Sequence, residues 1–505
     1  MKNRLMWVKF FMKKYILVIL MVAAACFAIS CQNKPGNADN VENTSSAEQV
    51  ANGEDEEPGG GFADRQNIDD GIGEHDFGGT EFTVVLSTKQ MQEPYFAAEQ
   101  SGAIIDDAVY KRNLDIEERF NVSLVLKDTG GDWDEVATAV KKSVMAGDGA
   151  YDLGLVHTFA GLTGLVGSGY LYDWNQIPGV DMDRPWWNPN IKETLTIDNR
   201  LYVASSDYVY QRPGVIYFNK QMITDFELES PYSLVKSGDW TWDELARMSG
   251  IVSADLNGDG VFDKSDRYGY AHWLNWQTVP VVHSNGLLLT EKDENGYPRY
   301  TPFGSEKMQI VVEKYYNLLY TDNKSYIIPQ SETLPTIGTY TPLFENGQIL
   351  FLHANTKLLN QYVGITLEFG MIPLPKYDKQ QQDYHCMADT QLMVIPADTA
   401  DIELCGIVSE ALSVYSYKYV VPVIYDVMYA NRYLRDEESY EMFNLIMKGL
   451  VYEFSWTFGE GNVMTYAMSN LMEQKSMDIA SFYEKNAPAV ERALANFIDK
   501  VMELD

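Results

Sequence analysis

One twelve-residue stretch of this 505-residue chain carries oxygen-bearing side chains at the spacing of a calcium-binding loop. It reads DLNGDGVFDKSD over 255–266, with Gly260 at the sixth position, where such loops turn sharply. Position twelve is Asp and not the usual Glu, so its carboxylate has a shorter reach. The alternative is a plain surface turn. We expect a structural Ca²⁺ whose ligands come from Asp255, Asn257, Asp259, Val261 (through its carbonyl), Asp263 and Asp266.

Aromatic side chains are the second group that suggests binding chemistry. Phe, Trp and Tyr make up 13% of the chain. Flat rings pack on the C–H faces of sugars, while acids and amides hydrogen-bond the hydroxyls. Trp273 and Trp276 flank Asn275 after a predicted turn, which favours a binding site. Trp240 and Trp242 flank a predicted helix start and are interpreted as packing residues.

Catalytic signatures are sparse. The sequence has no HExxH, GxSxG or GxxxxGK[ST] motif, and its six histidines lack metal-ligand spacing. A structural role is the simpler interpretation of His157 and His353. A glycosidase pair of carboxylates stays open, because 72 acidic residues make chance pairs inevitable.

The elements that would position these residues alternate between strand and helix. Hydrophobic periodicity predicts strands over 81–87, 122–126 and 151–156, with helices over 104–120 and 133–145. This order is typical of a parallel α/β lobe, in which ligands bind beyond the carboxyl ends of the strands. The third strand ends at His157 and Thr158, which are therefore candidates for a site.

A second region follows without a flexible linker. It predicts strands over 215–218, 349–352, 369–372 and 391–395, and helices over 241–252, 306–320 and 341–346. The two lobes are therefore expected to be crossed by several chain segments.

Charge and cysteine content narrow the class of partner. Asp and Glu number 72 against 39 Lys and Arg, a net charge of -33. Such a surface repels nucleic acid and anionic membranes, and it favours a neutral or cationic ligand. In the mature body only Cys386 and Cys405 remain, which either pair or stay as buried thiols.

The first 30 residues predict a bacterial export signal. A basic segment precedes an apolar run over 15–25, too short for a comfortable membrane span. Cys31 then follows small residues as in a lipoprotein signal, with Cys26 as a second candidate and ordinary secretion as the alternative. Residues 31–76, acidic and rich in Gly, predict a disordered tether.

Several segments together resemble the family 1 extracellular solute-binding proteins, carbohydrate-binding lipoproteins of ABC importers. They span about residue 80 to the C-terminus and are specific by their order and spacing. They are IDDAVYKRN (105–113), DRPWW (183–187), LYVASSD (201–207), IYFNK (216–220), DWTWDEL (239–245), the calcium-like loop with RYG (267–269), and GMIPLPKYD (370–378).

The resemblance implies an α/β periplasmic-binding-protein-like fold of two lobes (class II type). Lobe 1 would hold 77–206 plus 390–450, and lobe 2 would hold 207–389 plus 451–505. Carried over by position, it implies these ligand contacts: His157, Thr158, Asp207, Tyr208, Trp273, Asn275, Trp276, Asp389 and Trp456.

The resemblance also implies a function without chemistry. The lobes would close over a sugar or oligosaccharide, and the protein, a lipid-anchored monomer outside the cell membrane, would deliver it to ABC permease subunits. Two other classes stay open: a surface glycan-binding or adhesion protein, and a surface glycoside hydrolase or lyase.

Overall fold

The computed structural model describes residues 65–89, 95–321, 324–333, 341–362, 365–426, 437–459 and 463–504, and the structural statements below concern these residues. The predicted export signal, Cys26, Cys31 and the tether up to residue 64 lie outside them. No helix in the described part is both long and apolar enough to cross a membrane.

Lobe 1 is built around a four-stranded sheet with the order β12-β3-β1-β2. Its buried strands confirm those predicted from hydrophobic runs, and β1 pairs in parallel with both β2 and β3. The fourth strand, β12, lies antiparallel beside β3, with Gln391 opposite His157. The strands are β1 (Thr80–Leu86), β2 (Val122–Asp128), β3 (Leu153–His157) and β12 (Gln391–Val394).

Lobe 2 is built around a five-stranded mixed sheet with the order β10-β4-β9-β5-β8. The central strands β4 and β9 are fully buried, as their unbroken apolar runs predict. The strands are β4 (Gly214–Asn219), β5 (Tyr268–His272), β8 (Ser325–Ile327), β9 (Ile349–Asn355) and β10 (Phe369–Ile372). A hairpin adds β6 (Thr290–Lys292) and β7 (Pro298–Tyr300).

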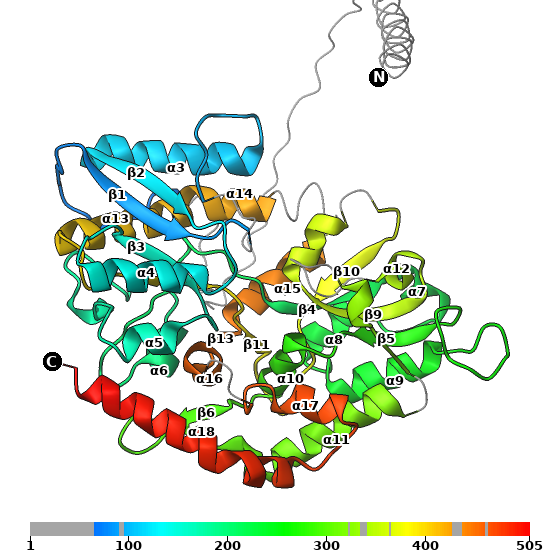
Figure 1. Ribbon diagram of the computed structural model, residues 1–505. Coiled ribbons are helices and arrows are strands. Elements are labelled where there is room, and N and C mark those ends of the chain that lie inside the picture. The colour runs from blue at the N-terminus through cyan, green and yellow to red at the C-terminus, as the bar shows by residue number, and fades with distance from the viewer. Residues whose placement is uncertain are drawn as a thin grey trace, which may run out of the picture. The chain divides into compact units, whose positions relative to one another are not determined.

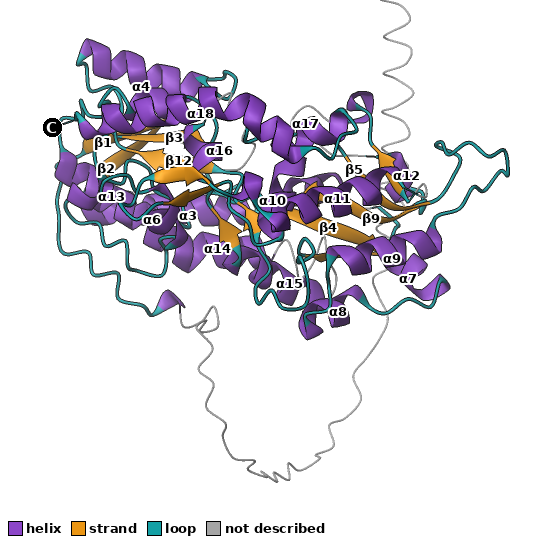
Figure 2. Ribbon diagram, turned by 90° about the horizontal axis from the view of Figure 1, so that it is seen from below, coloured by secondary structure: helices purple, strands orange, loops and turns teal. Residues whose placement is uncertain are grey.

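Helices cover both sheets (Figures 1 and 2). In the lobe 1 region they are α3 (Ile104–Phe120), α4 (Glu135–Ala146), α5 (Leu162–Val166), α6 (Asn190–Leu195), α13 (Ile402–Tyr415) and α14 (Val421–Asp426). In the lobe 2 region they are α7 (Lys220–Asp225), α8 (Pro231–Ser237), α9 (Trp242–Val252), α10 (Val279–Ser284), α11 (Glu306–Tyr320), α12 (Pro342–Glu345) and α15 (Glu437–Lys448). The chain continues with α16 (Phe454–Phe458), α17 (Ala467–Glu473) and α18 (Ile479–Met502).

Short segments connect the two sheets. One of them is a parallel two-stranded ribbon, which is formed by β11 (Cys386–Met387) and β13 (Leu450–Val451). The lobes inferred from the resemblance place residues up to 450 in lobe 1, whereas α15 packs against β10 and α8 of lobe 2. The last helix, α18, packs into both lobes: Val490 belongs to the core of lobe 2 and Phe497 to the core of lobe 1.

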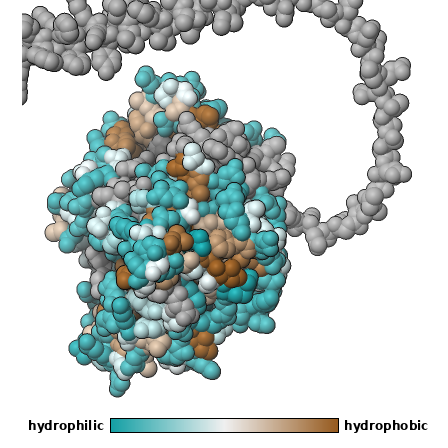
Figure 3. Space-filling model, turned by 90° about the vertical axis from the view of Figure 1, so that its right-hand side faces the viewer, coloured by the Kyte–Doolittle hydropathy of each residue, from teal (hydrophilic) through white to brown (hydrophobic). Residues whose placement is uncertain are grey.

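The two body cysteines are free thiols in different cores. Cys405 lies in the core of lobe 1 and Cys386 in that of lobe 2. Burial raises the pKa of each thiol to about 12, so both are held in the unreactive neutral form. Hydrophilic residues cover most of the described surface seen in Figure 3, and the hydrophobic ones form separate small patches.

Candidate functional site

The end of β3 brings two of the predicted residues to the edge of lobe 1. His157 closes a fully buried strand, and its side chain is only 3% exposed. The next residue, Thr158, donates its backbone N–H to the Thr390 carbonyl at 3.0 Å. This continues the β3–β12 pairing and places residues 389–391 beside His157.

Asp389 faces His157 across this pairing. An oxygen of its carboxylate lies 3.3 Å from His157 Nε2, close enough for an ion pair but without an aligned hydrogen bond. Burial lowers the pKa of His157, and the nearby carboxylate of Asp389 partly opposes that effect. A neutral imidazole in this position can hydrogen-bond a hydroxyl group.

Trp456 joins the same cluster from a distant part of the chain. It lies on the short helix α16, whose first turn is capped by the Glu453 carboxylate, which accepts from Ser455 N–H at 3.1 Å. The indole Nε1 of Trp456 donates to Thr158 Oγ1 at 2.8 Å. Four predicted ligand residues therefore meet here: His157, Thr158, Asp389 and Trp456.

Three further aromatic residues surround this cluster and were missed by the sequence analysis. The Trp133 ring packs edge-to-face on the His157 ring, with their centroids 4.3 Å apart. The ring centroids of Phe159 and Tyr466 lie 5.3 and 5.8 Å from that of Trp456. Each is partly exposed, so a ligand can reach part of each side chain. Trp133 follows β2 at the carboxyl edge of the sheet. The rule that ligands bind beyond the carboxyl ends of parallel strands therefore also points to Trp133, but the sequence analysis used it only for β3.

Asp207 and Tyr208 lie in a different set of contacts. Tyr208 is 2% exposed and packs against Tyr95 and the Arg112 guanidinium. Asp207 is partly buried, its backbone N–H bonds the Trp186 carbonyl, and burial raises the pKa of its carboxyl to about 7. Their ligand-binding role stays a prediction.

The segment after β5 provides the second predicted aromatic group, at the carboxyl edge of the lobe 2 sheet. Trp273 is 9% exposed and belongs to a core cluster. The Asn275 side chain accepts from Trp276 N–H at 2.7 Å and so caps its own turn. Trp276 is partly exposed and is the ring of this group most accessible to a ligand.

The calcium-like loop connects α9 to β5. Gly260 has a φ of +79°, which confirms the predicted tight turn. The Asp255 carboxylate accepts the N–H groups of Gly258 and Gly260, and the buried Asp266 accepts those of Leu256 and Asp263. No group of three or more His, Cys, Asp or Glu side chains in the described residues is arranged to hold a metal ion. Calcium binding here stays a prediction.

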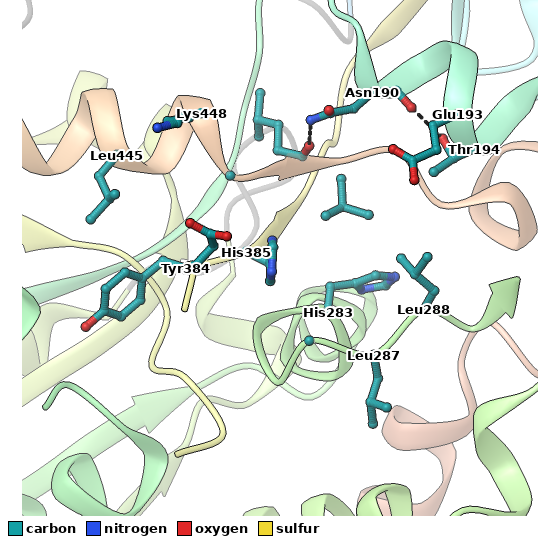
Figure 4. Close-up of a pocket in the computed structure, with 15 residues that line it drawn as sticks. Asn190, Glu193, Thr194, His283, Leu287, Leu288, Tyr384, His385, Leu445 and Lys448 are labelled. Carbon is teal, nitrogen blue, oxygen red and sulfur yellow. Dashed lines mark hydrogen bonds between the residues drawn. The ribbon is translucent and has the colours of Figure 1, made fainter. Parts of the chain in front are cut away.

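A separate cavity of about 420 Å³ lies beside the β11–β13 ribbon (Figure 4). Its wall from lobe 1 is α6, where Asn190 donates to the Leu450 carbonyl at 2.7 Å. Its opposite wall includes His283 of α10 and the following loop. It shares no lining residue with the His157 cluster, and the sequence analysis gave no signal for it.

The comparisons with known proteins agree with this arrangement. A family model described as "Bacterial extracellular solute-binding protein" matches residues 98–412. No curated protein sequence matches the chain significantly.

Solved structures resemble the fold at low sequence identity. The galacto-N-biose/lacto-N-biose I-binding protein of an ABC transporter from Bifidobacterium longum has a TM-score of 0.56 at 11% identity, covering 83% of this chain and 99% of its own. The cyclic α-maltosyl-1,6-maltose binding protein from Arthrobacter globiformis has 0.55 at 14%, covering 84% and 98%. UgpB from Mycobacterium tuberculosis, solved with glycerophosphocholine, has 0.54 at 15%, covering 84% and 99%.

Proposed function

Because the chain belongs to the bacterial extracellular solute-binding proteins, we propose that it is the substrate-binding lipoprotein of an ABC importer and captures a sugar or oligosaccharide between its lobes. The observation that carries the proposal is the cluster of His157, Asp389 and Trp456, which brings the end of a lobe 1 strand against a residue of the lobe 2 core. The partly exposed rings of Trp133, Phe159 and Tyr466 surround this cluster. Imidazole, carboxylate and partly exposed aromatic rings are the groups that bind hydroxyls and sugar faces.

The connecting segments suggest how the protein responds to its ligand. The β11–β13 ribbon is two residue pairs long, so a few backbone torsions there can change the angle between the lobes. A ligand that contacts both lobes binds the closed form more tightly and selects it. The closed form then presents its outer surface to the permease subunits.

Membrane attachment is part of the proposal. The export signal and Cys31 would place a lipid at the start of the mature chain, and the acidic segment up to residue 64 would act as a tether. The predicted tether is too long at its end, because Ile72 is 8% exposed in the core of lobe 1 and the Asp70 carboxylate pairs with Arg119 at 2.7 Å. The protein would work as a monomer on the outer face of the cell membrane, in keeping with the family's extracellular location.

Calcium binding by the 255–266 loop is proposed as a structural feature. Gly260 already makes the turn that such a loop requires. The carboxylates of Asp255 and Asp259 now accept hydrogen bonds from backbone N–H groups, and they would exchange these bonds for coordination of a bound calcium ion. Its effect would be on the stability of the α9–β5 connection and not on sugar binding.

A ligand screen tests the function. The full chain is titrated calorimetrically with mono- and oligosaccharides, and each bound ligand is recovered and analysed. Unchanged ligand supports a transport receptor, while cleaved product supports the hydrolase or lyase. Affinity for long polymers without lobe closure on short oligosaccharides, measured by small-angle scattering, supports the adhesion protein. Binding to no saccharide refutes the proposal.

A matched pair of variants locates the site. Trp133→Ala removes the partly exposed ring at His157, and we expect the affinity to fall by about two- to tenfold, because an aromatic contact contributes on the order of 0.5–1.5 kcal/mol. Tyr151→Ala changes an aromatic residue just before the opposite end of β3 and should leave the affinity unchanged. Equal effects of the two variants would place the ligand elsewhere.

A further inference from the structure

Two positively charged residues, Arg212 and Lys357, lie just beyond the paired ends of β4 and β9 at one edge of the lobe 2 sheet. The antiparallel register pairs Gly214 of β4 with Asn355 of β9. Just beyond this pair, the Thr356 N–H bonds the Pro213 carbonyl at 3.1 Å. Arg212 and Lys357 are the next residues along each strand's path. They are 3% and 5% exposed, so both are held within the protein.

This edge faces the His157 cluster of lobe 1. The Thr390 hydroxyl donates to the Tyr210 carbonyl at 2.7 Å, two residues before Arg212, and the Thr390 carbonyl accepts from Thr158. Burial lowers the pKa of His157, and the positive charges of Arg212 and Lys357 lower it further. The two cations and the candidate sugar site therefore form one region.

Buried acceptor atoms in the same region lack hydrogen-bond partners among the described residues. They are the amide oxygens Oε1 of Gln391, opposite His157 at the start of β12, and Oδ1 of Asn355, opposite Gly214 at the end of β9. Both residues are less than 5% exposed, and a buried acceptor without a partner is unfavourable. Hydroxyl groups of a ligand would satisfy these atoms, while the cations would hold a negative group.

The charged groups near the binding site have more effect on which ligand binds than the net charge of the whole protein has. The overall charge of -33 acts over a distance, but salt screens it beyond about 8 Å under physiological conditions. Arg212 and Lys357 act at contact. Both also interact with other groups of the protein. Arg carries five N–H donors and Lys three, so each can serve a protein partner and a ligand anion together.

We infer that the protein is specific for an acidic saccharide, one that carries a carboxylate as uronic acids do, with Arg212 and Lys357 holding the carboxylate and the aromatic residues near His157 contacting the sugar ring. This inference rests on the proposed function and narrows it. It also replaces the expectation of a neutral or cationic ligand that the net charge suggested. Arg212 presents the planar fork that matches a carboxylate, and Lys357 adds a second charge.

The test compares ligands that differ only in this charge. Oligosaccharides of galacturonic, glucuronic and mannuronic acid are titrated calorimetrically into the full chain, each beside its methyl ester. We expect the acid to bind about tenfold or more tightly than its ester, the range of a charge-assisted hydrogen bond. The preference should shrink as salt rises. Equal affinities for acid and ester, or tighter binding of neutral maltooligosaccharides, would refute the inference and leave the proposed function intact.

Variants and a second anion complete the test. Arg212→Gln and Lys357→Gln should each reduce the preference for acid over ester, while Lys236→Gln, at a half-exposed surface position, should not. A variant that does not fold leaves the acid–ester comparison on the unaltered chain decisive. If sugar phosphates or sulfates bind more tightly than uronates, the inference that the ligand carries a carboxylate is wrong. Binding of no saccharide refutes the proposed function itself.

Discussion

Replacing Glu453 by glutamine tests the buried polar junction beneath the candidate site. The Glu453 side chain is inaccessible to solvent and accepts from His283 Nε2 at 3.0 Å, Thr290 Oγ1 at 2.6 Å, Leu289 N–H at 2.9 Å and Ser455 N–H at 3.1 Å. His283 Nδ1 lies 3.1 Å from the Val279 carbonyl, so both ring nitrogens of His283 face acceptor atoms. Four donors thus converge on one carboxylate.

Glu453→Gln keeps the shape and removes the charge. The amide nitrogen would point a donor at groups that are themselves donors, and the His283 ring would lose the carboxylate that its Nε2 faces. Breaking a buried ion pair in this way costs about 3–5 kcal/mol. An unfolding entropy of about 2 cal/mol/K per residue gives about 1 kcal/mol/K for a chain of 505 residues. The melting temperature should therefore fall by about 3–5 °C.

The pH dependence gives a second readout. Burial by itself would raise the pKa of Glu453, but the hydrogen bond and charge of His283, with the Thr290 and Leu289 bonds, outweigh it and lower the pKa from 4.5. A carboxyl whose pKa is lowered by folding stabilises the protein above the unfolded value, and that stability is lost as the pH falls below about 4.5. Glu453→Gln removes this part of the acid destabilisation.

Calorimetric melts between pH 3.5 and 7 measure both effects. Glu118→Gln, at an exposed position on α3, is the matched control and should change neither the melting temperature nor its pH profile. A Glu453→Gln protein that melts within 1 °C of the unaltered chain, with the same pH profile, would refute the account of the junction.

Three further predictions concern other buried or charged groups. Burial raises the pKa of Glu410 to about 7, although its carboxylate accepts hydrogen bonds from the Trp186 and Trp187 indoles. Because the folded form then holds the proton more tightly than the unfolded form, the free energy of unfolding should fall by up to about 3 kcal/mol as the pH rises from 4.5 to 7. Urea titrations should show a smaller pH dependence for Glu410→Gln. Calcium should raise the melting temperature of the unaltered chain but not of Asp255→Asn, and an equal response of both would exclude the 255–266 loop. Cys386 and Cys405 should react with iodoacetamide only after unfolding, and rapid labelling in the native state would contradict their burial.

Much of the local structure could be predicted from the sequence. The helix over 306–320 and the strand over 369–372 have the predicted bounds, because each is a periodic or continuous apolar segment with clear end signals. For α11, Ser305 caps the first turn through its hydroxyl, which accepts from Met308 N–H. The strand that ends at His157 was likewise placed by its apolar run.

The composition of the candidate site depended on tertiary structure. Thr158 and Trp456 are 298 positions apart, and their hydrogen bond exists only because α16 returns to lobe 1 after the chain has built lobe 2. That Arg212 and Lys357 lie just beyond the same paired ends of β4 and β9 results from the register of the two strands, which no local pattern encodes. The sequence by itself determined most of the elements and the solute-binding family, while the export signal stays a prediction. Which side chains meet at the candidate site was decided by long-range packing, because contacts between distant segments depend on how whole lobes bury their apolar faces.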